Sequence, residues 1–294
     1  MFGNFIYFIL VLLIYLTYTP SEQTHFSGAE SLALALLLSL AFTGFVRRSF
    51  TRIEERIDRI GSARAAALFH SAQMRGAVTA VAVFALDVYG LNLPSFLIDW
   101  PFFAHVPTLA AVVFLALFAG HLALVWAFGF EAYRRLHPAA GFGRREYVGS
   151  HVSFSLPVLI PWVVASGLTD ALNALPFTGP KTFLATTEGQ LAYFGLIMLA
   201  IALVGPLMVQ RLWHCTPLAA GDHRERIEAL CRRAGMRYRD ILSWPLFGGR
   251  MVTAAVMGLI RRFRYILVTP ALLDLLAPRE IDAVVAHEIG HIKR

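Results

Sequence analysis

The sequence predicts a mainly α-helical membrane protein that carries a small α+β domain at its C-terminal end. Hydrophobic residues make up 57% of the 294 residues and charged residues 15%, against about 45–50% and about 25% in soluble domains. The apolar residues gather into six runs, with the basic residues between them, and from Arg211 onward charged residues become frequent. This composition excludes a disordered chain, a coiled coil and an ordinary soluble enzyme.

Six apolar runs predict membrane-spanning helices, because a helix needs about 20 residues to cross about 30 Å of hydrocarbon. The runs are residues 5–19, 31–46, 77–93, 106–130, 148–168 and 191–209. The first lacks the basic segment and the cleavage site of a signal peptide, so we interpret it as a retained helix. The third is the weakest, because Asp87 interrupts it. Pro157 and Pro161 predict a kink in the fifth.

The basic residues predict the orientation of these helices. Segment 47–75 holds seven arginines and segment 131–147 holds four, whereas the alternate segments 20–30, 94–105 and 169–190 together hold one lysine. Such an excess marks the cytoplasmic side. The two Arg-rich segments share one side only if an even number of crossings separates them, which supports a crossing by the third run. We therefore expect six crossings of a bacterial inner membrane, with both chain ends and the C-terminal domain in the cytosol.

We expect residues 1–210 to form the membrane domain and residues 211–294 to begin a cytosolic domain. Asp222 and Glu225 have the spacing of a capping box and Gly235 fits a helix stop, which predicts a helix between them.

The rest of the C-terminal region predicts a β-hairpin and two helices. Segments 251–257 and 264–269 are strand-like and are separated by a short turn. A short helix is expected over residues 270–276, and Pro278 suits the first position of the last helix.

The last helix contains the motif His287-Glu288-Ile289-Gly290-His291. Histidines at positions i and i+4 lie on one helix face, where both imidazoles reach one Zn²⁺ ion, and the intervening glutamate lies beside the metal-bound water. Apolar residues on the opposite side predict a buried stripe: Ile281, Val285, Ile289 and Ile292. The motif therefore predicts a single zinc site.

With these motifs in order, the region from about residue 227 to 294 resembles the membrane zinc endopeptidases of the CAAX prenyl protease and HtpX heat-shock protease type (peptidase family M-forty-eight). The resemblance rests on segments 254–258, 264–269 and 280–291. It implies a zincin-type α+β metalloprotease domain in which His287 and His291 bind zinc and Glu288 is the general base and later proton donor. It also implies that a glutamate on a following helix is the third zinc ligand.

The resemblance further implies that the hairpin offers an edge to an extended polypeptide substrate, a role we assign to Thr253, Ala254 and Ala255. The family usually has Asn-Ala where this chain has Thr253-Ala254. Because the sequence ends three residues after His291, we expect the third ligand beyond Arg294. We also expect the 294-residue chain to be the N-terminal part of a longer protease and to be inactive alone.

The predicted function is zinc-dependent hydrolysis of peptide bonds in membrane-associated or misfolded proteins, with a polypeptide substrate and the lipid bilayer as partners and no nucleic acid. One alternative is a catalytically inactive membrane module that acts in sensing or partner binding. A second is a transporter that uses Asp87 and His121, since ionisable groups inside a membrane are costly. Packing hydrogen bonds explain these two residues more simply.

Two other groups of residues suggest sites. His214, Cys215, His223 and Cys231 superficially resemble metal ligands, but their spacing contains no paired ligand motif, so we predict no second metal site. Arg261, Arg262 and Arg264 form a basic cluster. Contact with anionic lipid and a solvated hairpin turn are both open interpretations of it.

Overall fold

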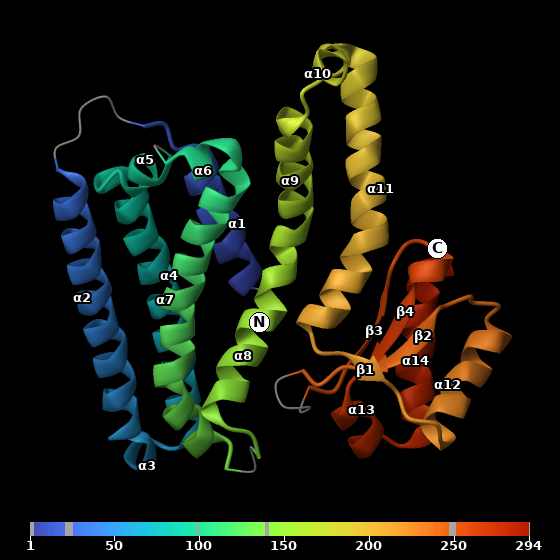
Figure 1. The fold of residues 1–294 in the computed structure, drawn as a ribbon. Coiled ribbons are helices and arrows are strands. Elements are labelled where there is room, and N and C mark those ends of the chain that lie inside the picture. The colour runs from blue at the N-terminus through green and yellow to red at the C-terminus, as the bar shows by residue number, and fades with distance from the viewer. Residues whose placement is uncertain (1–2, 21–25, 99, 139–140, 247–250, 294) are drawn as a thin grey trace. The chain divides into compact units, whose positions relative to one another are not determined.

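The computed structural model describes residues 3–20, 26–98, 100–138, 141–246 and 251–293, and the chain forms two compact units (Figure 1). The first unit comprises Met1–Leu159 and Ala165–Thr178, and the second comprises Ile160–Val164 and Gly179–Arg294. The predicted domain boundary after residue 210 lies near the end of α11 (Thr187–Leu212), within the second unit.

The first unit is a bundle of helices. Its elements are α1 (Gly3–Leu16), α2 (Gly28–Glu54), α3 (Ile57–Ile60), α4 (Ser62–Ala85), the π-helical turn η1 (Leu86–Gly90), α5 (Leu93–Ile98), α6 (Pro101–His105), α7 (Pro107–Leu136), α8 (Arg144–Ser155), the 3-10 turn η2 (Leu156–Leu159) and most of α9 (Ile160–Ala174). Helices α2, α4 and α7 pack against one another, and α8 packs against α7. Gly76 lets α4 approach α7 closely, because a Cβ atom there would lie 3.0 Å from the side chain of Val125.

Four helical segments within the described residues are long and apolar enough to cross a membrane. They are α2, α7, the continuous segment Arg144–Ala174 and α11 (Thr187–Leu212). All six predicted apolar runs are helical, but α1 has only 14 residues and α4 is not among the four. The structure therefore confirms a helical protein with several membrane-type spans, and it does not confirm six crossings.

The Arg-rich segment 47–75 lies between the second and third apolar runs, where a loop would connect two spans. In the structure this segment is largely helical. Helix α2 continues to Glu54, and α4 already begins at Ser62. Alanine has the highest helix propensity, and four alanines in residues 63–67 extend α4 into this polar segment. At Pro157, where a kink was predicted, the 3-10 turn η2 replaces the α-helical pattern, and α9 begins directly before Pro161.

The second unit combines membrane-type helices with a four-stranded sheet. Its elements are α10 (Thr178–Leu184), α11, β1 (Thr216–Pro217), α12 (Asp222–Arg233), β2 (Asp240–Ser243), β3 (Ala254–Met257), the 3-10 turn η3 (Arg261–Phe263), β4 (Tyr265–Val268), α13 (Pro270–Leu275) and α14 (Pro278–Lys293). The strand order is β1-β2-β4-β3. Strands β3 and β4 form the predicted antiparallel hairpin, whereas the parallel pairing of β2 with β4 was not predicted.

Helices α12 and α14 pack against each other and share one hydrophobic core with the sheet. Its fully buried members include Ile227 and Cys231 of α12, Ile266 of β4 and Ile281 of α14. Outside this core, Arg226 of α12 donates two hydrogen bonds, of 2.6 and 2.7 Å, to the carboxylate of Asp282 of α14. The core and this ion pair fix α14 against α12.

The ends of α12 show one correct and one wrong prediction. Gly235 follows the helix with φ +62°, which confirms the predicted stop. The predicted capping box is wrong, because Gly221 is the N-cap and Asp222 already lies in the first turn. A negative charge in the first turn still favours the helix through its dipole.

The connection from α11 to the sheet contains two stacked tryptophans. Trp213 directly follows α11, and Trp244 directly follows β2. Their ring centroids lie 4.5 Å apart with an interplanar angle of 18°. This stack joins the end of a membrane-type helix to the sheet.

Candidate active site

Helix α14 presents the predicted metal residues on its open side. Its inner face carries Ile281, Val285 and Ile289, which are 0%, 1% and 4% exposed. This stripe fixes the rotation of the helix about its axis. As a result, His287 and His291 are exposed and Glu288 is half-buried.

The two imidazoles face each other through the same ring atom. Nε2 of His287 lies 3.1 Å from Nε2 of His291, and the ring centroids are 4.7 Å apart with the rings nearly perpendicular, at 86°. In a tetrahedral zinc site with Zn–N distances of about 2.0–2.1 Å, two ligating nitrogens lie about 3.3–3.4 Å apart. The separation of the two Nε2 atoms is therefore within about 0.3 Å of that of two zinc ligands.

Glu288 completes the cluster. The potential ligand atoms of His287, Glu288 and His291 all lie within 4.8 Å of one another. In the part of the chain that the structure describes, no further histidine, cysteine or acidic residue joins them. A catalytic zinc site has three protein ligands and an open position for water or substrate, and the described residues offer two imidazoles and one carboxylate that could serve such a site.

The other four candidate metal residues lie apart from the cluster on α14. His214, Cys215, His223 and Cys231 do not form a group that could hold an ion. Burial raises the pKa of the Cys231 thiol to about 11 and that of Cys215 to about 12. Both raised pKa values reflect the burial of these thiols.

Strand β3 packs beside α14 and forms one edge of the sheet among the described strands. Thr269 N donates to Thr253 O at 3.1 Å, and Thr253 N donates to Thr269 Oγ1 at 3.1 Å. Backbone groups of an antiparallel strand point alternately toward and away from the partner strand. Ala255 therefore faces β4 with its backbone groups, and Ala254 and Val256 present theirs to the open edge.

The three predicted substrate residues thus occupy different environments. The backbone N–H and C=O of Thr253 are both hydrogen-bonded to Thr269, and the hydroxyl of Thr269 donates to Thr253 O at 3.0 Å. Ala254 combines a buried side chain with backbone groups on the open edge. The sequence analysis did not predict that Thr269 holds Thr253. The position of Thr269 directly before Pro270 indicates only that a helix begins there.

Among the described residues of the first unit, Asp87 and His121 are buried. His121 is 3% exposed, and its Nε2 atom lies 3.1 Å from Ser39 Oγ. Asp87 is 0% exposed and lies in η1. Neither carboxylate oxygen of Asp87 has a hydrogen-bond partner among the described residues. The contact with Ser39 thus accounts for Nε2 of His121 and leaves Asp87 unexplained.

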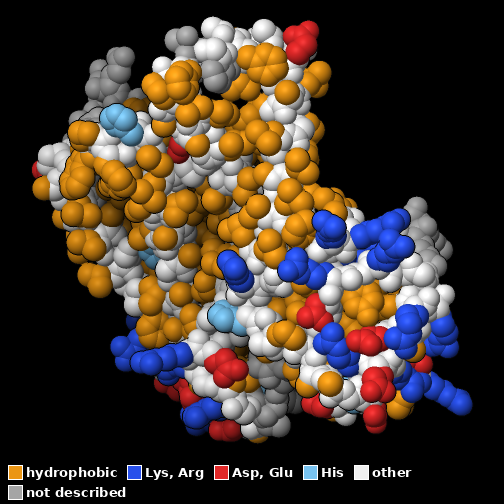
Figure 2. All heavy atoms as spheres, turned by 45° about the vertical axis from the view of Figure 1, so that its right-hand side comes forward, with side chains coloured by type: hydrophobic (Ala, Val, Ile, Leu, Met, Phe, Trp, Pro, Cys, Tyr) orange, Lys and Arg blue, Asp and Glu red, His pale blue; other side chains and the backbone are white. Residues whose placement is uncertain are grey.

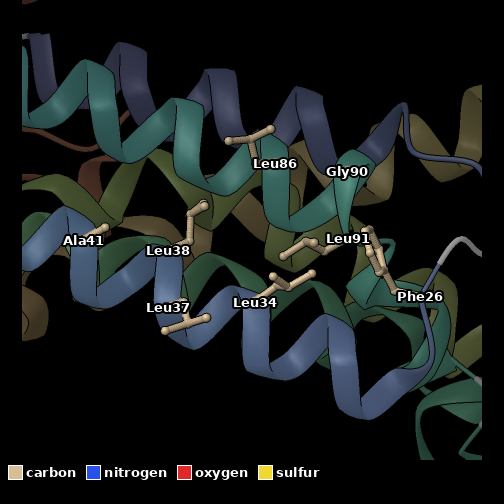
Figure 3. Close-up of a pocket in the computed structure, with 8 residues that line it drawn as sticks. All are labelled: Phe26, Leu34, Leu37, Leu38, Ala41, Leu86, Gly90 and Leu91. Atoms are coloured by element: carbon tan, nitrogen blue, oxygen red, sulfur yellow. The ribbon is translucent and has the colours of Figure 1, made fainter.

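An apolar groove of about 400 Å³ lies in the first unit between α2 and η1 (Figure 3). It is lined by Phe26, Leu34, Leu37, Leu38, Ala41, Leu86, Gly90 and Leu91. These side chains carry no polar group, so the groove contains no residue for acid–base or metal chemistry.

Two histidines and a glutamate on one helix, beside the open edge of a sheet, are the arrangement of a metallopeptidase. Residues 217–294 match the family model described as Peptidase family M48. This match confirms the resemblance predicted from the sequence, and together with the apolar helices it is consistent with a membrane metallopeptidase of that family. Searches of curated proteins and of solved structures found no match.

Proposed function

We propose that the protein is an integral-membrane, zinc-dependent endopeptidase that hydrolyses peptide bonds of membrane-associated or misfolded proteins. The observation that carries this proposal is the pair of facing Nε2 atoms of His287 and His291, 3.1 Å apart, with Glu288 beside them. An exposed imidazole pair of this geometry has no structural task in the described fold, since the opposite face of α14 makes the packing contacts.

His287 and His291 would hold the zinc ion through Nε2. When bound, zinc lowers the pKa of a water molecule to about 7 and polarises the scissile carbonyl. The Glu288 carboxylate accepts the proton of the attacking water and delivers it to the leaving amine. The half-buried position of Glu288 keeps its carboxylate beside the imidazoles and leaves it open to substrate.

The substrate would bind as an additional strand along β3. The backbone groups of Ala254 and Val256 point to the open edge, so an extended peptide would pair with them through main-chain hydrogen bonds. Such binding depends little on the substrate side chains, which suits an enzyme that acts on many unfolded segments. Because β3 packs beside α14, the bound peptide would run past the zinc residues.

The third zinc ligand and the membrane orientation are also part of the proposal. We expect a glutamate outside the described residues as the third ligand, as the family resemblance implies, and a location in the bacterial inner membrane with the sheet in the cytosol.

The test compares Glu288→Gln with wild type in the full-length protein as its gene encodes it. Loss of one proton-transfer group should lower casein hydrolysis by about 10² to 10⁴, whereas the zinc content measured by atomic absorption should stay unchanged. His287→Ala should lose both zinc and activity. Glu280→Gln on the same helix is the matched control, because that carboxylate accepts a hydrogen bond from Ala277 N and lies outside the metal cluster. Wild-type hydrolysis by Glu288→Gln would remove Glu288 from the mechanism.

One observation favours the transporter alternative, namely the buried Asp87 without a hydrogen-bond partner among the described residues. A transporter would lose proton or cation flux into proteoliposomes on Asp87→Asn and keep it on Glu288→Gln. Absence of flux in the wild-type protein would dismiss this alternative.

A further inference from the structure

The turn between β3 and β4, residues 258–264, has a fixed shape. Gly258 has φ +105°, and a Cβ atom at this position would lie 2.1 Å from Phe263 O. Arg264 donates from Nε to Gly258 O at 3.3 Å and from its terminal nitrogen to Leu259 O at 3.1 Å. Phe263 N donates to Ile260 O at 2.8 Å. These bonds hold the turn without help from other elements.

This turn presents one apolar and two basic side chains outward. Leu259 is 83% exposed, the highest value for a large hydrophobic side chain among the described residues. Arg261 and Arg262 are also exposed, and neither has an ion pair within the described part of the chain. A single exposed leucine is common, but a fixed turn that combines leucine with two unpaired arginines has the composition of a membrane-interface contact.

The turn lies against a membrane-type helix of the same unit. The residues of η3 contact α11, and Figure 1 shows the turn rising from the sheet alongside this helix. Arg211 near the end of α11 and Trp213 after it are residue types enriched where a span leaves the hydrocarbon. Figure 2 shows basic side chains of the C-terminal region gathered next to the hydrophobic surface of α11.

We propose that the β3–β4 turn is a membrane anchor: Leu259 enters the interface of the bilayer that α11 crosses, and Arg261 and Arg262 bind anionic phospholipid headgroups. The proposal rests on the contact with α11 and on charge, and it does not depend on the proposed peptidase activity. Of the two interpretations of the basic cluster, contact with anionic lipid and a solvated turn, the proposal adopts contact with lipid. Because β3 leads directly into the turn, the anchor holds the open strand edge at the membrane surface.

The experiment measures the depth of the turn in the full chain reconstituted into nanodiscs of phosphatidylcholine and phosphatidylglycerol. Leu259→Cys is labelled with an environment-sensitive fluorophore, and quenching by doxyl lipid is compared with quenching by aqueous iodide. The matched control is Leu275→Cys, which is 70% exposed and lies at the end of α13, beyond the opposite end of β4. The native thiols of Cys215 and Cys231 have raised pKa values and label slowly, and the unsubstituted chain measures that background.

We expect the label at position 259 to be quenched by doxyl lipid and protected from iodide, and the label at position 275 to show the reverse. Each arginine near an anionic surface contributes about 1 kcal/mol, which corresponds to about a five-fold change in the ratio of inserted to free turn. Arg261→Gln and Arg262→Gln together should therefore lower that ratio about 25-fold, and pure phosphatidylcholine should act in the same direction.

Three results would overturn the proposal. Equal iodide quenching at positions 259 and 275 would show a solvated turn. Protection from iodide without doxyl quenching would show that protein covers Leu259. Unchanged insertion in the double arginine variant would remove the headgroup contacts.

Discussion

Truncation of Ile281 tests whether the packing of α14 supports the metal site. Ile281 is fully buried between α12 and the sheet, and it precedes the zinc motif by more than one helical turn, so it does not touch the zinc ligands. Ile281→Ala removes three carbon atoms. At about 0.8 kcal/mol for each buried CH₂ group, the transfer term is about 2.4 kcal/mol. The remaining cavity adds to this, within the range of about 2–5 kcal/mol for such substitutions.

We therefore expect Ile281→Ala to lower the free energy of unfolding of the C-terminal region by about 3 kcal/mol, and Ile281→Val by about 1 kcal/mol. The assay is urea unfolding of the detergent-solubilised chain, followed by the fluorescence of the stacked Trp213 and Trp244. EDTA is present, because a bound metal would add its own stabilisation.

Leu275→Ala is the control for this series, because it removes apolar carbons from a side chain that is 70% exposed. It should change the free energy of unfolding by less than about 0.5 kcal/mol. If Ile281→Ala costs no more than Leu275→Ala, α14 is not held by this core, and our account of how the zinc residues are presented is wrong.

Three further predictions concern topology, pH and the turn. Single cysteines at Ser27 and Ala185 should react with an impermeant thiol reagent from outside the cell, and cysteines at Ser62 and Gly141 should not; labelling of all four from one side would refute six crossings. The hydrogen bonds from Arg226 lower the pKa of Asp282, so the ionised carboxylate stabilises the fold. This stabilisation, which Asp282→Asn removes, should be fully present above the unfolded pKa of about 3.9 and should vanish as the pH falls through the folded pKa. The difference between the urea midpoints of the wild type and the variant, measured between pH 7 and pH 3, tests this, and a constant difference contradicts it. Gly258→Ala should destabilise the hairpin by more than about 1 kcal/mol, because Gly258 has a positive φ. Gly290→Ala should be neutral or stabilising, because the new methyl group meets no neighbouring side chain within 4 Å. Equal urea midpoints for the two variants would show that the turn tolerates a side chain.

Strong local signals explain what the sequence predicted of the fold. The apolar runs are helical, and the longest of them are uniform enough to need no tertiary information. The hairpin was predictable from two β-rich segments around a short turn, and the family match covers the same region. The zinc motif was recognised because two histidines at helical spacing with an adjacent glutamate are rare by chance.

Elements that depend on distant partners were not predictable. Strand β2 has only four residues, and its parallel pairing with β4 joins segments more than twenty residues apart. The bonds between Arg226 and Asp282 join two helices that are separated in sequence by β2, β3 and β4. Thr269 gave no signal of its own, because its role at Thr253 exists only once the hairpin has formed. The N-terminus of α12 was assigned to Asp222 because the sequence pattern does not distinguish an N-cap residue from a first-turn acid.

The stacked Trp213 and Trp244 have a mechanical consequence. A flexible linker would let the sheet swing freely below the membrane, but two aromatic rings in face-to-face contact join the end of α11 to the loop after β2. Helices respond to bilayer thickness by tilting, and a tilt of α11 is then passed on to the sheet as a rigid rotation. The stack and the contact of η3 with α11 therefore couple the orientation of the β3 edge to the tilt of α11.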